Sequence, residues 1–192
     1  MTALVIGLLL FLGVHSVRIV AEPWRSATLA RVGEGAWKGV YSLVSLAGFA
    51  LIVWGYAQAR QAPVPLWAPL PGMRHLASLL TLFAFVLLAA AYVPGNGIKA
   101  RLHHPMVLGV KVWALAHLLA NHTLADLLLF GGFLLWAAAS FRSARRRDAA
   151  AGTRYPAGTL GRTAITVVVG LAAWAAFAFW AHAAWIGVRP MG

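Results

Sequence analysis

Cysteine is absent from this sequence of 192 residues, and acidic residues are scarce. Without cysteine the chain forms no disulfide, no thiolate-ligated iron–sulfur cluster, no haem attachment of the CxxCH type and no cysteine nucleophile. The four acidic residues form no carboxylate pair within an apolar segment: they are Glu22, Glu34, Asp126 and Asp148. A glycine-rich phosphate loop and an HExxH zinc motif are also missing. Any metal or haem must therefore be bound by histidine, methionine or oxygen ligands.

Charge is sparse as well, because only 10% of the residues are charged whereas 61% are hydrophobic. A soluble domain cannot bury that much apolar surface, so the composition indicates a membrane protein. The formal net charge of +12 would suit a nucleic-acid-binding protein. The basic residues, however, lie between apolar runs of about twenty residues, as they do in membrane proteins. We therefore expect membrane lipids, and no nucleic acid, as partners.

Six apolar segments are long enough, or nearly so, to cross a hydrocarbon core of about 30 Å at about 1.5 Å per residue. Only helices satisfy their own backbone hydrogen bonds in lipid, so we predict an all-α, polytopic bundle of about six transmembrane helices. The predicted helices are 2–20, 37–59, 75–93, 105–120, 123–141 and 164–187. The first has no basic start and no cleavage pattern, which favours a retained span over a signal peptide.

Short connections give two further predictions. The fourth and fifth segments are separated by only Asn121, His122 and Thr123, so they should form a tight antiparallel hairpin. Pro105 suits the first turn of one of these helices, and Thr123 with Asp126 resembles a capping box at the start of the other.

The basic residues predict the orientation. Twelve of the sixteen Lys and Arg residues lie on one side of the predicted bundle, three lie on the other, and Lys111 lies inside a span. By the positive-inside rule the richer side faces the cytoplasm and both termini face outward. We divide the chain into a membrane core at 1–142, a basic cytoplasmic loop at 143–163, and a further transmembrane helix with its tail at 164–192.

Histidines are the residues best suited to carry chemistry, and two of the seven lie deep in predicted spans. His15 lies about 6 Å to the cytoplasmic side of the centre of its helix, and His117 about 7 Å to the outer side of its own. Arg18 shares a face with His15, and Trp113 shares a face with His117. Two imidazoles about 13 Å apart along the membrane normal could be axial ligands of a haem, with Arg18 at a propionate.

Two alternatives stay open for these histidines. They could be hydrogen-bonded between helices with a purely structural role, which is the interpretation we favour for His103, His122 and His182. The second alternative is a metal site at the outer end of the bundle, built from His75, His117 and His182.

Lys111 lies near the middle of its span, where an uncompensated charge costs about 2.5–3.5 kcal/mol. Its partners would be backbone carbonyls, a polar cavity or an anionic group such as a propionate. Desolvation could instead leave it neutral and make it a candidate base.

Roughly residues 1–142 show a resemblance to a known family. The residues that carry it are His15-Ser16 with Arg18, Gly33-Glu34, Tyr41-Ser42-Leu43, His75, His104-Pro105 with Gly109, and Trp113 followed by Leu115-Ala116-His117. Together they resemble the NnrU family of bacterial membrane proteins, which is related to the plastid 15-cis-zeta-carotene isomerase.

The resemblance implies a multi-pass protein of the bacterial inner membrane that is needed for the expression or activity of nitrite and nitric oxide reductases in denitrification. The carotenoid relative is a haem b enzyme that isomerises a cis double bond. Its two haem-ligating histidines match His15 and His117, and a further functionally important histidine matches His75. Its alternative iron ligand, a cysteine, corresponds to Ala114, which cannot ligate.

Our first hypothesis is therefore a membrane protein that binds haem b, with His15 and His117 as iron ligands and with Arg18, His75, Lys111 and Trp113 around the cofactor. It would support nitrogen-oxide reductases, with isomerase-like chemistry on an isoprenoid as a further expectation of the resemblance. The second hypothesis is a non-enzymatic accessory or assembly factor with structural histidines. The third is a small transporter with Lys111 as the counter-ion of its substrate.

Overall fold

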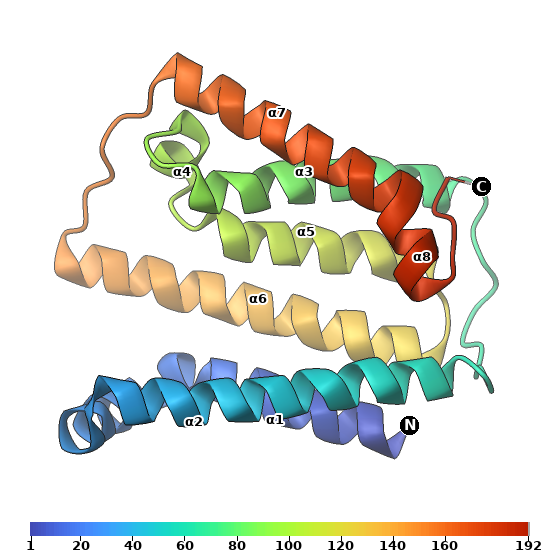
Figure 1. Cartoon of the computed structure of the whole chain (residues 1–192), viewed down its shortest axis with the longest axis horizontal. Coiled ribbons are helices and arrows are strands. Elements are labelled where there is room, and N and C mark those ends of the chain that lie inside the picture. Colours follow the sequence, from blue (N-terminus) through green and yellow to red (C-terminus); the bar gives the residue numbers. More distant parts are fainter. Residues whose placement is uncertain (192) are drawn as a thin grey trace.

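The computed structural model describes residues 1–191 as a bundle of helices that run side by side (Figure 1). Five helical stretches are long and apolar enough to cross a membrane, and a sixth apolar helix is shorter. In chain order the elements are α1 (Thr2–Val20), α2 (Glu22–Ala59), α3 (Met73–Tyr92), α4 (Gly97–Leu102), α5 (Pro105–Ala120), α6 (Leu124–Ala151), α7 (Leu160–Ala176), a π-helical turn (Phe177–Ala181) and α8 (His182–Ile186). The prediction of an all-α membrane bundle is confirmed.

Both ends of the described chain lie at the same end of the bundle, which fits an even number of crossings (Figure 1). The shorter helix α5 has 16 residues, which span about 24 Å at about 1.5 Å per residue. It therefore nearly crosses a hydrocarbon core by itself.

The α5–α6 hairpin forms as predicted, with Pro105 in the first turn of α5. Thr123 caps α6, and both bonds of the capping box are present, with the Thr123 N–H donating to Asp126 Oδ2 at 2.9 Å. The proline-rich segment before α3 joins this turn through the Leu66 N–H, which donates to the His122 carbonyl at 2.8 Å.

Three segments that we predicted as loops are helical instead, and the shortest of them is α4. Helix α2 begins at Glu22, well before the predicted start at residue 37, and it bends at Gly33, whose φ of 81° is positive. Glu22 is paired with Arg25, and Glu34 with Lys38. Such pairs three or four residues apart favour a helix that an apolar-run prediction does not detect.

Helix α6 also continues into the segment predicted as a basic loop at 143–163, and it ends only at Ala151. Arg147 donates to Ser143 Oγ at 2.7 Å along this extension, and alanine and arginine both have high helix propensity. Gly152, with a φ of 59°, terminates the helix.

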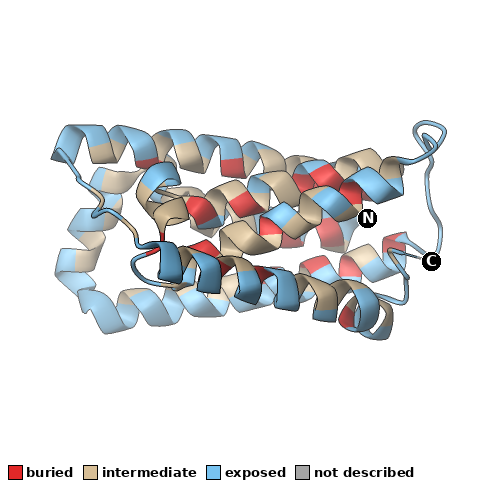
Figure 2. Cartoon of the chain, turned by 90° about the horizontal axis from the view of Figure 1, so that it is seen from above, coloured by how far each residue is buried: buried red, intermediate tan, exposed pale blue. Residues whose placement is uncertain are grey.

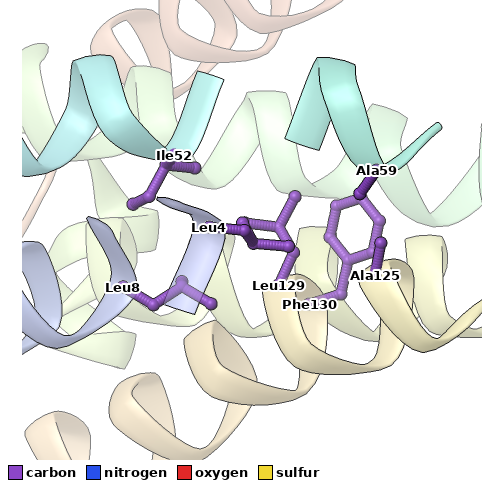
Figure 3. Close-up of a cluster of buried hydrophobic side chains, with 7 residues drawn as sticks. All are labelled: Leu4, Leu8, Ile52, Ala59, Ala125, Leu129 and Phe130. Atoms are coloured by element: carbon purple, nitrogen blue, oxygen red, sulfur yellow. The ribbon is translucent and has the colours of Figure 1, made fainter. Parts of the chain in front are cut away.

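The helices pack in the order α2, α1, α6, α5, α3, α7, so that α6 separates α1 from α5. One buried apolar cluster joins α1, α2 and α6, and Figure 3 shows its side chains between these three helices: Leu4, Leu8, Ile52, Ala59, Ala125, Leu129 and Phe130. Buried residues lie along the facing sides of the helices, whereas the outer sides are exposed (Figure 2). Large apolar side chains such as Leu9 and Leu135 are on those outer sides, as expected for surfaces that face lipid.

Candidate functional site

His15 and His117 have the same local hydrogen bond, each to the carbonyl one helical turn earlier. His15 Nδ1 lies 2.7 Å from the Phe11 carbonyl oxygen, and His117 Nδ1 lies 2.9 Å from that of Trp113. A carbonyl only accepts, so Nδ1 carries the proton in both rings and Nε2 of the neutral imidazole keeps a free lone pair. Within residues 1–191 neither Nε2 has a hydrogen-bond partner. Both rings therefore have the tautomer of a metal-binding imidazole whose second nitrogen is fixed by a backbone carbonyl.

Three helices surround the ring of His15. Phe11 of α1 stacks on it with 4.2 Å between ring centroids, Tyr41 of α2 lies at 5.1 Å, and the indole of Trp136 of α6 meets it edge-on at 6.0 Å. The Trp136 Nε1–H is buried and has no acceptor within the described chain, and the same is true of the Ser45 hydroxyl on α2. Unsatisfied polar groups of this kind are rare in native cores, and such groups often mark a functional site or the position of a bound ion or water.

His117, in the last turn of α5, also has aromatic neighbours. Phe130 of α6 stacks on its ring at 4.6 Å, and Trp113 of its own helix lies at 5.1 Å. Asn121 donates to the His117 carbonyl at 2.8 Å and so fixes the last turn of α5. The ring is thus held between two large aromatic side chains.

A row of aromatic rings runs between the two histidines. Phe133 of α6 lies 5.8 Å from Phe11 and 5.6 Å from Trp113, measured between ring centroids. Trp136 marks the level of His15 on α6 and Phe130 marks that of His117, so the two levels differ by six residues, or about 9 Å at about 1.5 Å per residue. The two imidazoles do not contact each other in the described structure. The side chain of Phe133 lies between their levels.

Among the other predicted cofactor residues, Trp113 belongs to this row of aromatic rings. Arg18 lies one turn beyond His15, where its Nε is 3.6 Å from Glu22 Oε2 in an exposed ion pair. Lys111 is exposed on α5, with no side-chain hydrogen bond or ion pair among the described residues.

His75 is exposed in the first turn of α3. Because α3 packs against α5 and α7, His75 is on the neighbour of the helix that carries His117 and does not belong to the surroundings of His15. His182 is engaged elsewhere, with its Nδ1 2.7 Å from the Val188 carbonyl oxygen. Within residues 1–191 no group of three His, Asp or Glu side chains is placed to hold a metal ion. The alternative metal site from His75, His117 and His182 is therefore not formed.

Sequence reasoning did not detect one contact near this region. The hydroxyl of Tyr56 on α2 donates to Oδ1 of Asp126 on α6 at 2.6 Å, whereas the sequence suggested only a capping role for Asp126. No local signal relates residues 70 positions apart, so this contact emerges only from the packing of α2 on α6.

A family model described as NnrU protein matches residues 3–190 of this chain. The match extends through the last helix, beyond the residues 1–142 over which motifs are visible in the sequence. No curated protein and no solved structure matches the chain.

Proposed function

Because the chain belongs to the NnrU family, we propose that it is a multi-pass protein of the bacterial inner membrane that binds haem b through His15 and His117 and supports nitrite and nitric oxide reductases in denitrification. The observation that carries the haem proposal is the matched hydrogen bonding of the two rings, each with Nδ1 bonded to a carbonyl and Nε2 free. The family resemblance supports the connection to denitrification.

The donor set suits haem iron better than other metals. Neither imidazole is hydrogen-bonded to a carboxylate of residues 1–191, and the chain has no thiolate. Two neutral imidazoles of this kind are a donor set that would suit the iron of a b-type haem. A structural zinc site would need four ligands, and the described residues assemble no group of three. The aromatic side chains around both histidines provide the apolar surroundings that a porphyrin ring requires. The buried, unpaired Nε1–H of Trp136 beside His15 offers a hydrogen-bond donor that the protein itself does not use.

Each residue would have a distinct role in this site. His15 and His117 would ligate the iron through Nε2, and the Phe11 and Trp113 carbonyls would fix the tautomer and raise the basicity of the rings. Arg18 has an exposed ion pair with Glu22, and its guanidinium would be available to a propionate near headgroup level. Phe133 lies between the levels of the two histidines, so its side chain would have to turn aside when the cofactor enters.

When bound, the haem would supply a redox-active iron that also takes nitric oxide, and we assign the protein a redox- or nitric-oxide-responsive role. Ala114 is fully buried on α5 and supplies no thiolate. An isomerase reaction that depends on exchanging a histidine for a cysteine ligand is therefore outside the proposal.

The test is an absorption spectrum of the protein purified in detergent. We expect a Soret band with the low-spin signature of two histidine ligands, lost in His15→Ala and in His117→Ala. The matched control is His122→Ala, in the turn between α5 and α6, which should keep the band. A colourless protein that still restores reductase activity in cells would reject the haem and favour an accessory protein with structural histidines.

A further inference from the structure

A shallow cavity of about 310 Å³ opens at the end of the bundle where the basic residues are concentrated, far from the outer turn that holds His122. It lies between the turn that precedes α5 and the last turns of α6. The residues that line it are His103, Arg145, Asp148, Ala149, Gly152 and Thr153. None of them has a role in the proposed haem site.

Side chains from three segments form a connected polar cluster beside this cavity. The ring of His103 stacks flat on that of Tyr155 at 4.2 Å, with an interplanar angle of 6°, and Arg145 contacts His103 Nδ1. His104 Nε2 donates to Asp148 Oδ2 at 2.7 Å, and the Tyr155 hydroxyl donates to the same oxygen at 2.9 Å. The cluster thus ties the start of α5 to the end of α6 and to the connection before α7.

Asp148 is the acidic member of this cluster, and its charge is already engaged. Desolvation opposes ionisation, but the hydrogen bonds from Tyr155 and His104 outweigh it and lower the pKa of the Asp148 carboxyl. Arg145 lies close enough to contribute to this lowering. The hydrogen bonds to Asp148 come from His104 and Tyr155, whereas Arg145 lines the cavity and contacts His103. The guanidinium of Arg145 is therefore a positive charge at the cavity that no hydrogen bond to Asp148 engages.

His103 has an unusual backbone conformation. Its φ is 69° and its ψ is −53°, and it is the one non-glycine residue with a positive φ between residues 1 and 191. Residues other than glycine rarely adopt a positive φ. Backbone strain of this kind is concentrated at binding and active sites, where the surrounding structure maintains the strained conformation. Here the strained backbone places the imidazole over Tyr155, beside Arg145 and at the edge of the cavity.

The depth of the cavity follows from the length of α6. Arg145 comes 21 residues after Leu124 in this helix, which corresponds to about 32 Å at about 1.5 Å per residue. A hydrocarbon core is about 30 Å thick. With the first turn of α6 at one interface, Arg145 and the cavity therefore lie at the level of the lipid headgroups at the other.

We propose that this cavity binds the phosphate group of an anionic phospholipid, held by the guanidinium of Arg145, the ring of His103 and the hydroxyl of Thr153. The planar fork of an arginine matches two phosphate oxygens at once. The shared chemistry is a phosphate group, and the headgroup depth favours a lipid over a soluble phosphate compound as its source.

The experiment is native mass spectrometry of the full chain in detergent, titrated with phosphatidylglycerol. We expect one tightly held lipid per chain, at least tenfold weaker binding in Arg145→Gln, and no comparable binding of diacylglycerol, which lacks the phosphate. The matched control is Arg146→Gln, which removes the same charge from the same turn but does not line the cavity, and it should change the affinity less than twofold. Equal weakening in both variants would overturn the proposal, because it would indicate general attraction to a basic surface.

Two further measurements identify the source of the phosphate group and test the role of His103. Competition by inorganic phosphate at concentrations similar to those of the lipid would support the phosphate site and assign it to a soluble compound. His103→Gly should fold, because glycine adopts a positive φ without strain, and it should bind phosphatidylglycerol at least threefold more weakly. Unchanged binding in this folded variant would remove His103 from the site and overturn the proposed ligand set.

Discussion

The Tyr56 hydroxyl donates to Asp126 Oδ1 at 2.6 Å and joins the last turns of α2 to the first turn of α6. The same carboxylate accepts from the backbone N–H and the hydroxyl of Thr123 through its other oxygen. Asp126 is buried, with 5% of its surface exposed. One carboxylate therefore couples the packing of α2 on α6 to the turn that closes the α5–α6 hairpin.

Tyr56→Phe should destabilise the protein by about 1–3 kcal/mol, because it leaves Oδ1 of a buried carboxylate without a donor. The measurement is thermal unfolding in detergent, followed by circular dichroism. Tyr92→Phe is the control, since Tyr92 is 75% exposed and its hydroxyl has no partner in the described structure. Equal midpoints for the two variants would show that the Tyr56 bond contributes nothing to stability.

Gly7→Ala should destabilise the contact between α1 and α2 by about 1–3 kcal/mol, the usual range for overpacking. A Cβ at Gly7 would lie 2.6 Å from the backbone nitrogen of Ile52 and 2.8 Å from the carbonyl oxygen of Gly48. Both are backbone atoms, so the helices must move apart. The control is Gly13→Ala on the same helix, where a Cβ meets nothing within 4 Å. That change should leave the thermal midpoint unchanged or raise it, since alanine favours the helix.

The membrane helices could be located from the sequence because an apolar run is a strong and local signal. The predicted segment 105–120 coincides with α5, and the predicted segment 2–20 coincides with α1. The start of α2 was missed because charged residues between positions 22 and 36, such as Arg31 and Glu34, interrupt the apolar run without interrupting the helix. Charge ends a hydrophobic segment, whereas a helix ends only where the backbone can no longer continue.

In the candidate site, contacts within one helix could be predicted from the sequence, whereas contacts between helices could not. The contacts of His15 with Phe11 and of His117 with Trp113 follow from helical periodicity, because the partners are four residues apart. The level of Trp136 beside His15 depends on how α6 is positioned against α1, and no sequence pattern indicates this. Stacking of His103 on Tyr155 is likewise set by the path of the chain between α6 and α7.

Acid should weaken the cluster around Asp148. The folded pKa of this carboxyl lies below its unfolded value of 3.8 because Tyr155 and His104 donate to it. A lowered pKa stabilises the fold at pH values above 3.8, and this contribution disappears as the pH falls through the folded pKa. Between about pH 6 and about pH 3 the thermal midpoint should therefore fall less in Asp148→Asn than in the parent protein.

Tyr155→Phe offers a graded form of the same experiment. Removing one donor to Asp148 raises the folded pKa of the carboxyl toward 3.8, so less stability is left to lose on acidification and the loss should be complete at a higher pH. Arg154→Gln changes a charge beside Tyr155 without a described bond to Asp148, and its acid profile should follow that of the parent. A Tyr155→Phe profile identical to the parent would contradict the assigned bond.

Phe133→Ala tests whether the side chain of Phe133 must move when haem binds. Phe133 lies 5.8 Å from Phe11 and 5.6 Å from Trp113, at a level between the two histidines. Holding a side chain away from its preferred rotamer costs about 0.5–1.5 kcal/mol, and each 1.4 kcal/mol corresponds to about tenfold in affinity. If haem entry displaces Phe133, the alanine variant should bind haem about three- to tenfold more tightly in a titration of apo-protein followed at the Soret band. Phe83→Ala, on the exposed side of α3, should leave the affinity unchanged. Weaker binding in Phe133→Ala would instead mean that the phenyl ring forms part of the pocket wall, and the cofactor would then lie beside the aromatic row and not across it.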